Sequence, residues 1–485
     1  MVLSLILVME TQTKLRTNVI ETNKNINFPI GTIFAVQKYY KKLKFSKVFS
    51  EHKKRGRNIN SLIKAMVSYK LTENFSISKA SNWINRDEVL QRFNLKNFEE
   101  RTLFRLLNII GENKEKIIAN IQDCLFNTYQ FEHTNINMDW TSLVLYGNKA
   151  SLGKHGYSRD HRPDKKQMTL GVAELADPIN VPVGLTVKEG NVNDMAHFED
   201  TYNQIKGKLK KGSLVTFDKG ANSKENLELI LADKMKYLTA KKLNKSDDKR
   251  IKEFDKTKAE LIDADRKVYG LKFTKPNSID YFYFSEGLQK EQLEAKKRKA
   301  QKMFEEAKQI QDSLNKNNGL PKKFRINNKL VDVTYSYQTK LGEISEKEAL
   351  ELVEKATITG REGFFCLKSS ENLTLSEALQ TYRKKDSIEK IFHSLKNEIE
   401  IKPLRVWSEN GINGALIIGF IAQLFISLMR YDFDELKHTS TKFIKKSLMN
   451  LTVTVEFVKK CSKRFIYANF DPINELILTQ NQAIT

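Results

Sequence analysis

The order of helix-like and strand-like segments constrains the fold of this chain more than any other feature. Apolar residues recur at helical spacing in residues 33–43, 60–69, 76–83, 97–110 and 114–127. From residue 135 the pattern changes to short β-prone runs at 135–139, 142–146, 168–174, 182–188, 214–218 and 236–241, with helices expected at 194–209 and 223–233. Strand hairpins followed by a helix and a further strand predict an α/β fold with a mixed sheet.

A second stretch, residues 242–375, interrupts this pattern. It holds β-prone runs at 268–274, 278–285, 323–337 and 363–368, a highly charged helix at 288–314 and a shorter helix at 346–355. We therefore expect six parts: a ragged N-terminus (1–26), a helical DNA-binding domain (27–130), the first part of the core (131–241), a β-rich insertion (242–375), the second part of the core (376–430) and a basic C-terminal region (431–485).

Composition narrows the class of partner. The 82 Lys and Arg residues exceed the 59 Asp and Glu residues by 23, which favours nucleic acid as a partner, although an AT-rich genome also enriches lysine. The three cysteines are far apart and predict neither a disulfide framework nor a zinc site, which indicates a reducing compartment. Residues 1–9 resemble a signal-peptide core but lack a basic start and a small-residue cleavage site, so we expect a ragged N-terminus there. The apolar run 414–429 predicts a buried helix rather than a membrane span.

Three acidic residues are candidates for a shared metal site. Asp139 and Asp218 each close a β-prone run, so we expect them at strand ends on the rim of a sheet. Glu389 lies in a segment, 382–396, that reads as one amphipathic helix. Two strand-end carboxylates and a helix carboxylate would form an all-oxygen site suited to Mg²⁺ or Mn²⁺.

The helix at 382–396 has two distinct faces. Apolar residues at 388, 391, 392 and 395 are expected to face a core, whereas Tyr382, Lys385, Glu389, His393 and Lys396 share a second stripe. Taken alone, this stripe is equally compatible with a solvated helix face that carries ion pairs.

The same residues resemble a known family. Tyr382, Lys385, Glu389 and Lys396 match the signature Y-x2-R-x3-E-x6-K of bacterial insertion-sequence transposases of the DDE type, the IS-four superfamily, with Lys in the Arg position. The segments HGYSRDHRPDKKQ (155–167), GNVND (190–194) and FDKGANS (217–223) are similar to the same family. The resemblance extends from about residue 30 to about residue 430.

The resemblance implies an RNase H-like core with a β-rich insertion, and a transposase that cleaves and joins DNA by a cut-and-paste route. It implies Asp139, Asp218 and Glu389 as ligands of two Mg²⁺ or Mn²⁺ ions, with Tyr382, Lys385 and Lys396 as contacts to DNA. The expected partners are double-stranded DNA, as terminal inverted repeats and target, and a second copy in a homodimer, with no membrane. The expected location is the bacterial cytoplasm, at the nucleoid. A degenerate relative that only binds DNA, and a nuclease that does not join, remain alternatives.

Other basic segments are further candidates for DNA contact. They are the loop containing Lys53, Lys54, Arg55 and Arg57, and the loop 147–166 with His155, Arg159 and Arg162. A packing domain with a solvated turn is the alternative for the first loop, and a metal role is disfavoured for the second by its many cations. Asp194 is expected to cap a helix, and Trp407 to lie in the core rather than to stack on a base. The basic tail is expected to bind DNA or a second subunit.

Overall fold

The computed structural model describes residues 26–52, 56–72, 76–147, 149–316, 323–326, 329–332, 346–402, 404, 406–459 and 462–479. These residues form two compact units. Unit 1 contains the chain up to Thr216, Ser223–Met235 and everything from Lys384 onward, and unit 2 contains Phe217–Asn222 and Lys236–Arg383. The six-part division expected from the sequence remains a prediction.

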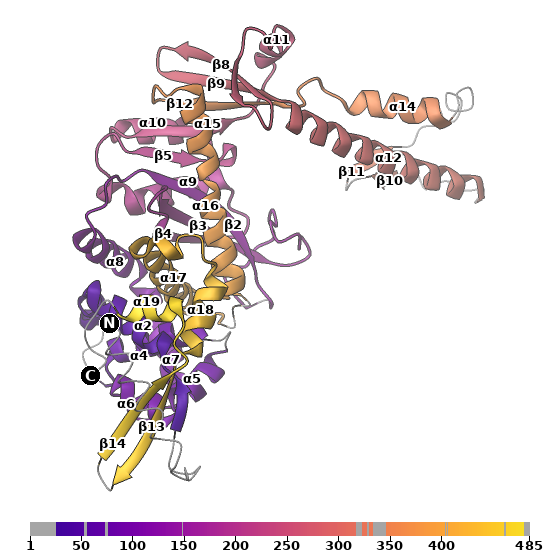
Figure 1. Ribbon diagram of the computed structural model, residues 1–485. Coiled ribbons are helices and arrows are strands. Elements are labelled where there is room, and N and C mark those ends of the chain that lie inside the picture. The colour runs from indigo at the N-terminus through magenta and orange to yellow at the C-terminus, as the bar shows by residue number, and fades with distance from the viewer. Residues whose placement is uncertain are drawn as a thin grey trace. The chain divides into compact units, whose positions relative to one another are not determined.

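The N-terminal region of unit 1 is mainly helical, as the sequence predicts (Figure 1). The early helices are α2 (Gly31–Lys42), α3 (Ser46–Phe49), η2 (Ser50–His52), α4 (Ile59–Thr72), α5 (Ile77–Ile84), α6 (Asp87–Phe93), α7 (Arg101–Glu112) and α8 (Lys114–Thr128). Ser76 caps α5 by accepting a hydrogen bond from the Lys79 amide, as its position before an apolar periodic run suggests.

The sheet of unit 1 follows these helices. Its strands are β2 (Ile136–Val144), β3 (Gln167–Leu175), β4 (Val181–Glu189) and β5 (Leu214–Phe217), in the order β4-β3-β2-β5. Both the β2–β3 and the β3–β4 pairs are antiparallel. The helices between the strands are α9 (Asp194–Ile205), η3 (Lys206–Lys208) and α10 (Lys224–Ala232). Asn193, not Asp194, caps α9: its side chain accepts from the Ala196 amide, and Asp194 is the first helical residue.

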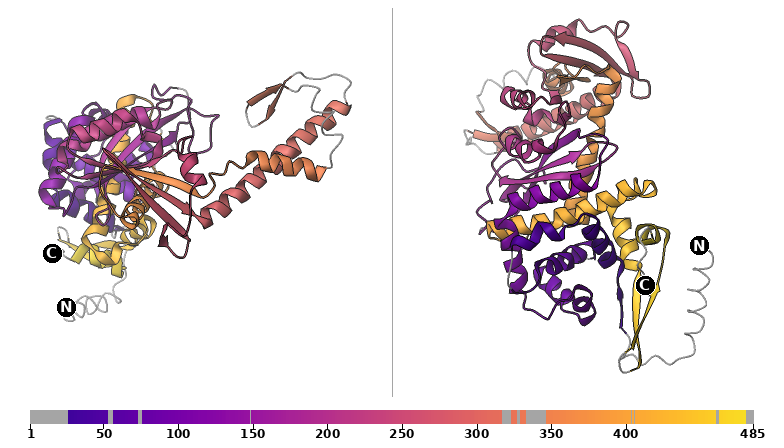
Figure 2. Two further views of the ribbon diagram at one scale, coloured as in Figure 1. Left: turned by 90° about the horizontal axis from the view of Figure 1, so that it is seen from above. Right: turned by 90° about the vertical axis from the view of Figure 1, so that its left-hand side faces the viewer.

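The C-terminal part of unit 1 packs onto its N-terminal part. It comprises α16 (Asp386–His393), η5 (Ser394–Glu398), α17 (Glu409–Asp432), η6 (Asp434–Leu436), α18 (Thr441–Asn450), β13 (Thr452–Lys459), β14 (Ser462–Ala468) and α19 (Pro472–Thr479). The strand β1 (Ile26–Pro29) pairs antiparallel with β13, which pairs with β14, and Figure 2 shows the three side by side. This small sheet, which joins the two ends of the described chain, was not expected.

Helix α17 is the core element of unit 1. Figure 1 shows it between the early helices and the strands, and it contacts α4, α7 and β4. It is long and apolar enough to cross a membrane, but 94% of its apolar window is buried inside the protein, so the burial expected from the sequence is confirmed. A Cβ on Gly414 would lie 2.0 Å from the Leu107 carbonyl oxygen, which explains why glycine stands where α17 crosses α7.

Unit 2 contains the strand-rich insertion. Its strands follow the order β6-β12-β9-β8-β7, and each neighbouring pair is antiparallel. The strands are β6 (Lys236–Lys241), β7 (Glu260–Asp263), β8 (Val268–Lys275), β9 (Ser278–Ser285) and β12 (Phe364–Ser369), with a separate pair of β10 (Lys323–Ile326) and β11 (Lys329–Asp332). The helices are η4 (Lys219–Ala221), α11 (Asp247–Lys252), α12 (Glu286–Lys316), α14 (Glu346–Thr357) and α15 (Leu375–Lys384).

The predicted fold class is confirmed: helices come first, then a core of strands and helices, then a strand-rich insertion. The charged helix expected at 288–314 is α12, which contacts α14 within unit 2 (Figure 1). Part of the β-prone run 323–337 lies outside the described residues.

Candidate active site

Asp139 lies inside strand β2 rather than at its end. The sequence suggested two short runs separated after Asp139, but β2 pairs with β3 without interruption from Ile136 to Val144. The reason is local: Trp140 and Thr141 favour strands, and no glycine or proline breaks the run. Asp139 is the half-buried position of an otherwise buried strand, and its Oδ1 accepts a hydrogen bond from the Trp140 amide at 2.8 Å.

The predicted helix 382–396 is divided into three pieces. Helix α15 ends at Lys384, α16 begins at Asp386, and a π-helical turn, η5, follows from Ser394. The apolar stripe is confirmed, since Ile388, Ile391, Phe392 and Leu395 are buried. Glu389 is exposed on α16, and α16 contacts the strand that carries Asp139. Within unit 1, strand β2 and helix α16 are therefore in contact, and they carry two of the three candidate carboxylates, Asp139 and Glu389.

The two signature lysines have protein partners. Lys385 is 5% exposed, and its Nζ lies 3.8 Å from Asp139 Oδ2. Lys396 is 9% exposed and donates to Thr141 Oγ1 at 2.8 Å and to Asp160 Oδ1 at 3.1 Å. Burial lowers the pKa of Lys396, and the charge of Asp160 opposes this shift. Both lysines thus brace β2 in this structure, and their contact with DNA remains a prediction.

Asp218 follows directly after β5, as predicted. Within unit 2, the Tyr382 hydroxyl donates to Asp218 Oδ1, and the Asp218 carbonyl oxygen accepts from the Ala221 amide at 3.1 Å. The signature tyrosine therefore orients a candidate carboxylate, and the predicted contact of Tyr382 with DNA is untested. Both signature residues upstream of Glu389 bind a candidate aspartate of their own unit: Tyr382 binds Asp218, and Lys385 pairs with Asp139.

Sequence reasoning missed a buried polar cluster beside Asp139, which we call the Glu174 cluster: Asn137, Glu174 and Ser387. Glu174 on β3 lies opposite Asn137 on β2, and its Oε2 accepts from Ser387 Oγ at 2.8 Å. Asn137 Nδ2 donates to the same hydroxyl at 3.3 Å. Burial raises the pKa of Glu174 to about 8, against the opposing hydrogen bonds and the charge of Lys385. The one sequence signal was a glutamate inside an otherwise apolar strand.

The loop 147–166 has mixed contacts. His155 is exposed. Arg159 Nη2 donates to Asp194 Oδ2 at 2.5 Å, and Arg162 forms two hydrogen bonds of 2.8 Å with Asp164. The loop is thus held to α9 by Arg159, while His155 and Arg162 stay at the surface. Their contact with DNA stays a prediction.

The basic loop near residue 55 is only partly described. Lys53, Lys54 and Arg55 lie outside the described residues. Arg57 Nη2 donates to the Asn97 carbonyl oxygen at 2.6 Å, and its guanidinium lies 5.6 Å from the Phe98 ring centroid. Arg57 therefore links two early segments of unit 1, and its DNA contact stays a prediction.

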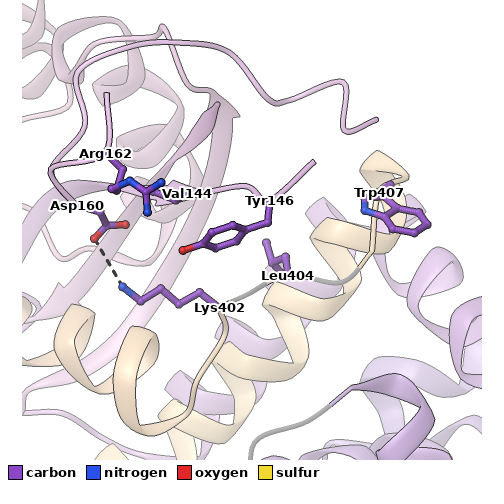
Figure 3. Close-up of a pocket in the computed structure, with 7 residues that line it drawn as sticks. All are labelled: Val144, Tyr146, Asp160, Arg162, Lys402, Leu404 and Trp407. Atoms are coloured by element: carbon purple, nitrogen blue, oxygen red, sulfur yellow. Dashed lines mark ion pairs between the residues drawn. The ribbon is translucent and has the colours of Figure 1, made fainter. Parts of the chain in front are cut away.

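A pocket of about 830 Å³ opens beyond the end of β2 in unit 1 (Figure 3). It is lined by Val144, Tyr146, Asp160, Arg162, Lys402, Leu404 and Trp407. The expectation that Trp407 lies in the core is wrong: this residue is 53% exposed and borders the pocket. Its segment lies just before α17, outside the apolar periodicity that buries that helix.

The chain matches a known protein family. The model of the family described as "Transposase DDE domain" matches residues 131–425. Among solved structures, a cryo-EM structure of the piggyBac transposase synaptic complex with hairpin DNA is similar, with 10% sequence identity, 89% of this chain and 81% of that chain covered, and a TM-score of 0.41. A search of curated proteins found no match.

Proposed function

Because this chain belongs to the family of transposase DDE domains, a family of polynucleotidyl transferases that act on DNA, we propose that it is an insertion-sequence transposase of the IS-four type. In this proposal it cleaves the ends of a mobile element and joins them to a target by a cut-and-paste route. The observation that carries it is the family match over 131–425, which includes Asp139, Asp218 and Glu389 as well as the signature around Glu389.

DDE transposases generally use divalent metal ions, and the chemistry of these three side chains suits such ions. Carboxylate oxygens are the ligands that Mg²⁺ and Mn²⁺ prefer, and in this structure the Lys385 ammonium, 3.8 Å from Asp139 Oδ2, supplies the positive charge that balances this carboxylate. Among the described residues, no group of three or more His, Cys, Asp or Glu side chains is gathered closely enough to hold a metal. We propose that Asp139, Asp218 and Glu389 hold two Mg²⁺ ions in the complex with DNA. Bound there, the ions would neutralise charge at the phosphate and activate the attacking oxygen.

The protein's own residues orient these carboxylates. The Tyr382 hydroxyl fixes one oxygen of Asp218, and the Trp140 amide fixes one oxygen of Asp139. The Glu174 cluster ties β2 and β3 to α16 through Ser387, which lies two residues before Glu389. Such bracing holds acidic side chains in place before substrate binds, which reduces the cost of ordering them in the reaction.

The proposed partners are the terminal inverted repeats of the element, the target DNA and a second copy of this chain. The net charge of +23 supports a polyanionic partner. A location at the bacterial nucleoid follows from the same proposal.

The test is strand cleavage and strand transfer on DNA that carries the inverted repeats flanking the gene. Asp139→Ala, Asp218→Ala and Glu389→Ala are each expected to reduce both steps to background while DNA binding persists. Glu435→Ala, a change at an exposed carboxylate of η6, serves as the matched control and should retain activity. Wild-type rates in all three variants would refute the assignment.

The same assay separates the alternatives. Binding without nicking by the wild-type protein would identify a degenerate relative, and nicking without joining would identify a nuclease.

A further inference from the structure

The helical segment that carries Glu389 ends in a strained turn. Helix α16 runs directly into η5, a π-helical turn in which the Ile399 amide donates to the Ser394 carbonyl oxygen at 2.7 Å. Such turns are uncommon and are often found at functional sites. Glu400 then adopts φ +56°, a left-handed conformation that is unfavourable for a residue with a side chain. This end of the segment therefore needs partners that hold it in place.

Two buried lysines are those partners. Lys445 in α18 is 9% exposed, and its Nζ donates to the Glu398 carbonyl oxygen at 2.5 Å. Lys70 in α4 is 6% exposed, and its Nζ donates to the Glu400 carbonyl oxygen at 3.1 Å. Figure 1 shows α18 at this end of the segment, and α18 contacts both η5 and α4. Carbonyl groups at a helix C-terminus lack partners inside the helix and carry negative partial charge, so ammonium groups suit them.

Keeping these two cations in the interior is unfavourable in itself. Burial lowers the pKa of both lysines. The charge of Lys445 lowers the pKa of Lys70 further, whereas the carboxylate of Glu400 opposes the shift in both. An apolar side chain at either position would avoid the desolvation but would leave buried carbonyl oxygens unpaired. The two lysines therefore indicate that this turn must keep a defined position.

The turn connects directly to the candidate active site. Lys396 lies within η5 and donates to Thr141 Oγ1 on β2, the strand that carries Asp139. Glu389 lies earlier in the same uninterrupted helical run. A rotation or a slide of the turn would therefore move both Lys396 and Glu389 relative to β2.

We propose that Lys70 and Lys445 are positioning residues for the reaction at Asp139 and Glu389. They fix the C-terminal end of the α16–η5 segment, so that Glu389 keeps its place against β2. Both lysines lie outside residues 131–425, so parts of the chain on either side of the matched domain act on its catalytic segment. This inference rests on the proposed function, because it takes Glu389 as an active carboxylate.

The first experiment compares the cleavage rate with the affinity for DNA. Lys70→Met and Lys445→Met are expected to reduce the rate of strand cleavage at saturating DNA by about 10- to 100-fold, because a small displacement of a reacting group has an effect of this size. The affinity for terminal-repeat DNA should change by less than about threefold, since both ammonium groups are turned to the protein interior. Lys445→Arg keeps a cationic donor and should restore most of the rate.

Lys38→Met is the matched control. Lys38 Nζ also donates to a carbonyl oxygen near the end of a helix, that of Ile477 in α19, at 2.5 Å, and burial also lowers its pKa. This change should lower the thermal unfolding temperature to a similar extent and leave the cleavage rate unchanged. An equal loss of rate in Lys38→Met would reduce the effect to general destabilisation and would overturn the proposal.

The second experiment needs no catalysis. Hydrogen–deuterium exchange at the Ile399 and Ile401 amides, which donate to carbonyl oxygens of η5, reports whether the turn is held. Exchange should become at least about 10-fold faster in Lys70→Met and Lys445→Met, from the loss of a hydrogen bond by a charged donor, and should not change in Lys38→Met. Unchanged exchange in both variants, or wild-type cleavage rates in both, would overturn the proposal. Failure of the proposed function looks different: the wild-type protein would cleave no DNA, although exchange at the turn still responded to the two substitutions.

Discussion

The two ends of strand β2 face opposite kinds of environment. At its first half, Asn137 joins the closed Glu174 cluster, and Asp139 pairs with the buried Lys385. Beyond its last residue, Tyr146 and Trp407 stand open to solvent around a pocket. Both regions contain cations. In the first region the cation pairs with protein oxygens in a buried position, whereas in the second region lysine side chains lie near the surface. The first region therefore fixes the position of a candidate active-site carboxylate, whereas the second region is open to a ligand.

The largest expected effect tests whether the closed region is held by a protonated acid. The pKa of Glu174 is raised from 4.5 to about 8. The stability that the protonated Glu174 side chain contributes to the folded state is therefore fully present below pH 4.5 and is lost as the pH rises through about 8. Glu174→Gln cannot ionise. Relative to this variant, the wild-type protein should lose about 1.4 kcal/mol of unfolding free energy per pH unit across that window.

Urea unfolding at pH 5, 6.5 and 8 measures this difference. Glu435→Gln, at an exposed site in η6, controls for a change of charge alone. Parallel stability curves for the wild-type and Glu174→Gln proteins would show that Glu174 is ionised in the folded state.

The next effect concerns the cation beside Asp139. Lys385→Met removes a charge that lies 3.8 Å from a largely buried carboxylate, and we expect a loss of about 3 kcal/mol in unfolding free energy. Lys385→Arg keeps the positive charge and matches the family signature, so its stability should be close to that of the wild-type protein. If the Met variant is as stable as the Arg variant in urea unfolding, the pair does not brace β2.

The sequence predicts the structural features that depend only on residues near one another in the chain. The apolar stripe at Ile388, Ile391 and Phe392 gave the buried face of α16, and the run before Asp218 gave a strand that ends there. The pattern of apolar residues along a segment shows which side of a helix or strand is buried and where the segment ends. Both of these predictions depend only on such local information.

What the sequence did not contain depends on neighbours that are distant along the chain. Glu174 meets Asn137 only through the register of β2 with β3, and the β1–β13 pair joins residues more than 400 positions apart. The residue type alone predicts that Trp407 lies in the core, because large aromatic residues are usually buried. Its exposure reflects the pocket around it, which no pattern in its own segment reveals.

The smallest effect compares one lysine from each region in DNA binding. Lys402 is near the surface of the pocket, so Lys402→Met should reduce the slope of log affinity against log salt by about 0.9, the loss of one phosphate contact. Lys396→Met should reduce the slope less than Lys402→Met does, because the Lys396 ammonium is held more closely by Thr141 and Asp160 in the free protein. Binding is measured by fluorescence anisotropy at several salt concentrations, after thermal unfolding has shown that both variants are folded. A reduced slope for Lys396→Met alone would reverse the comparison, since DNA would then enter the region that is closed in the free protein.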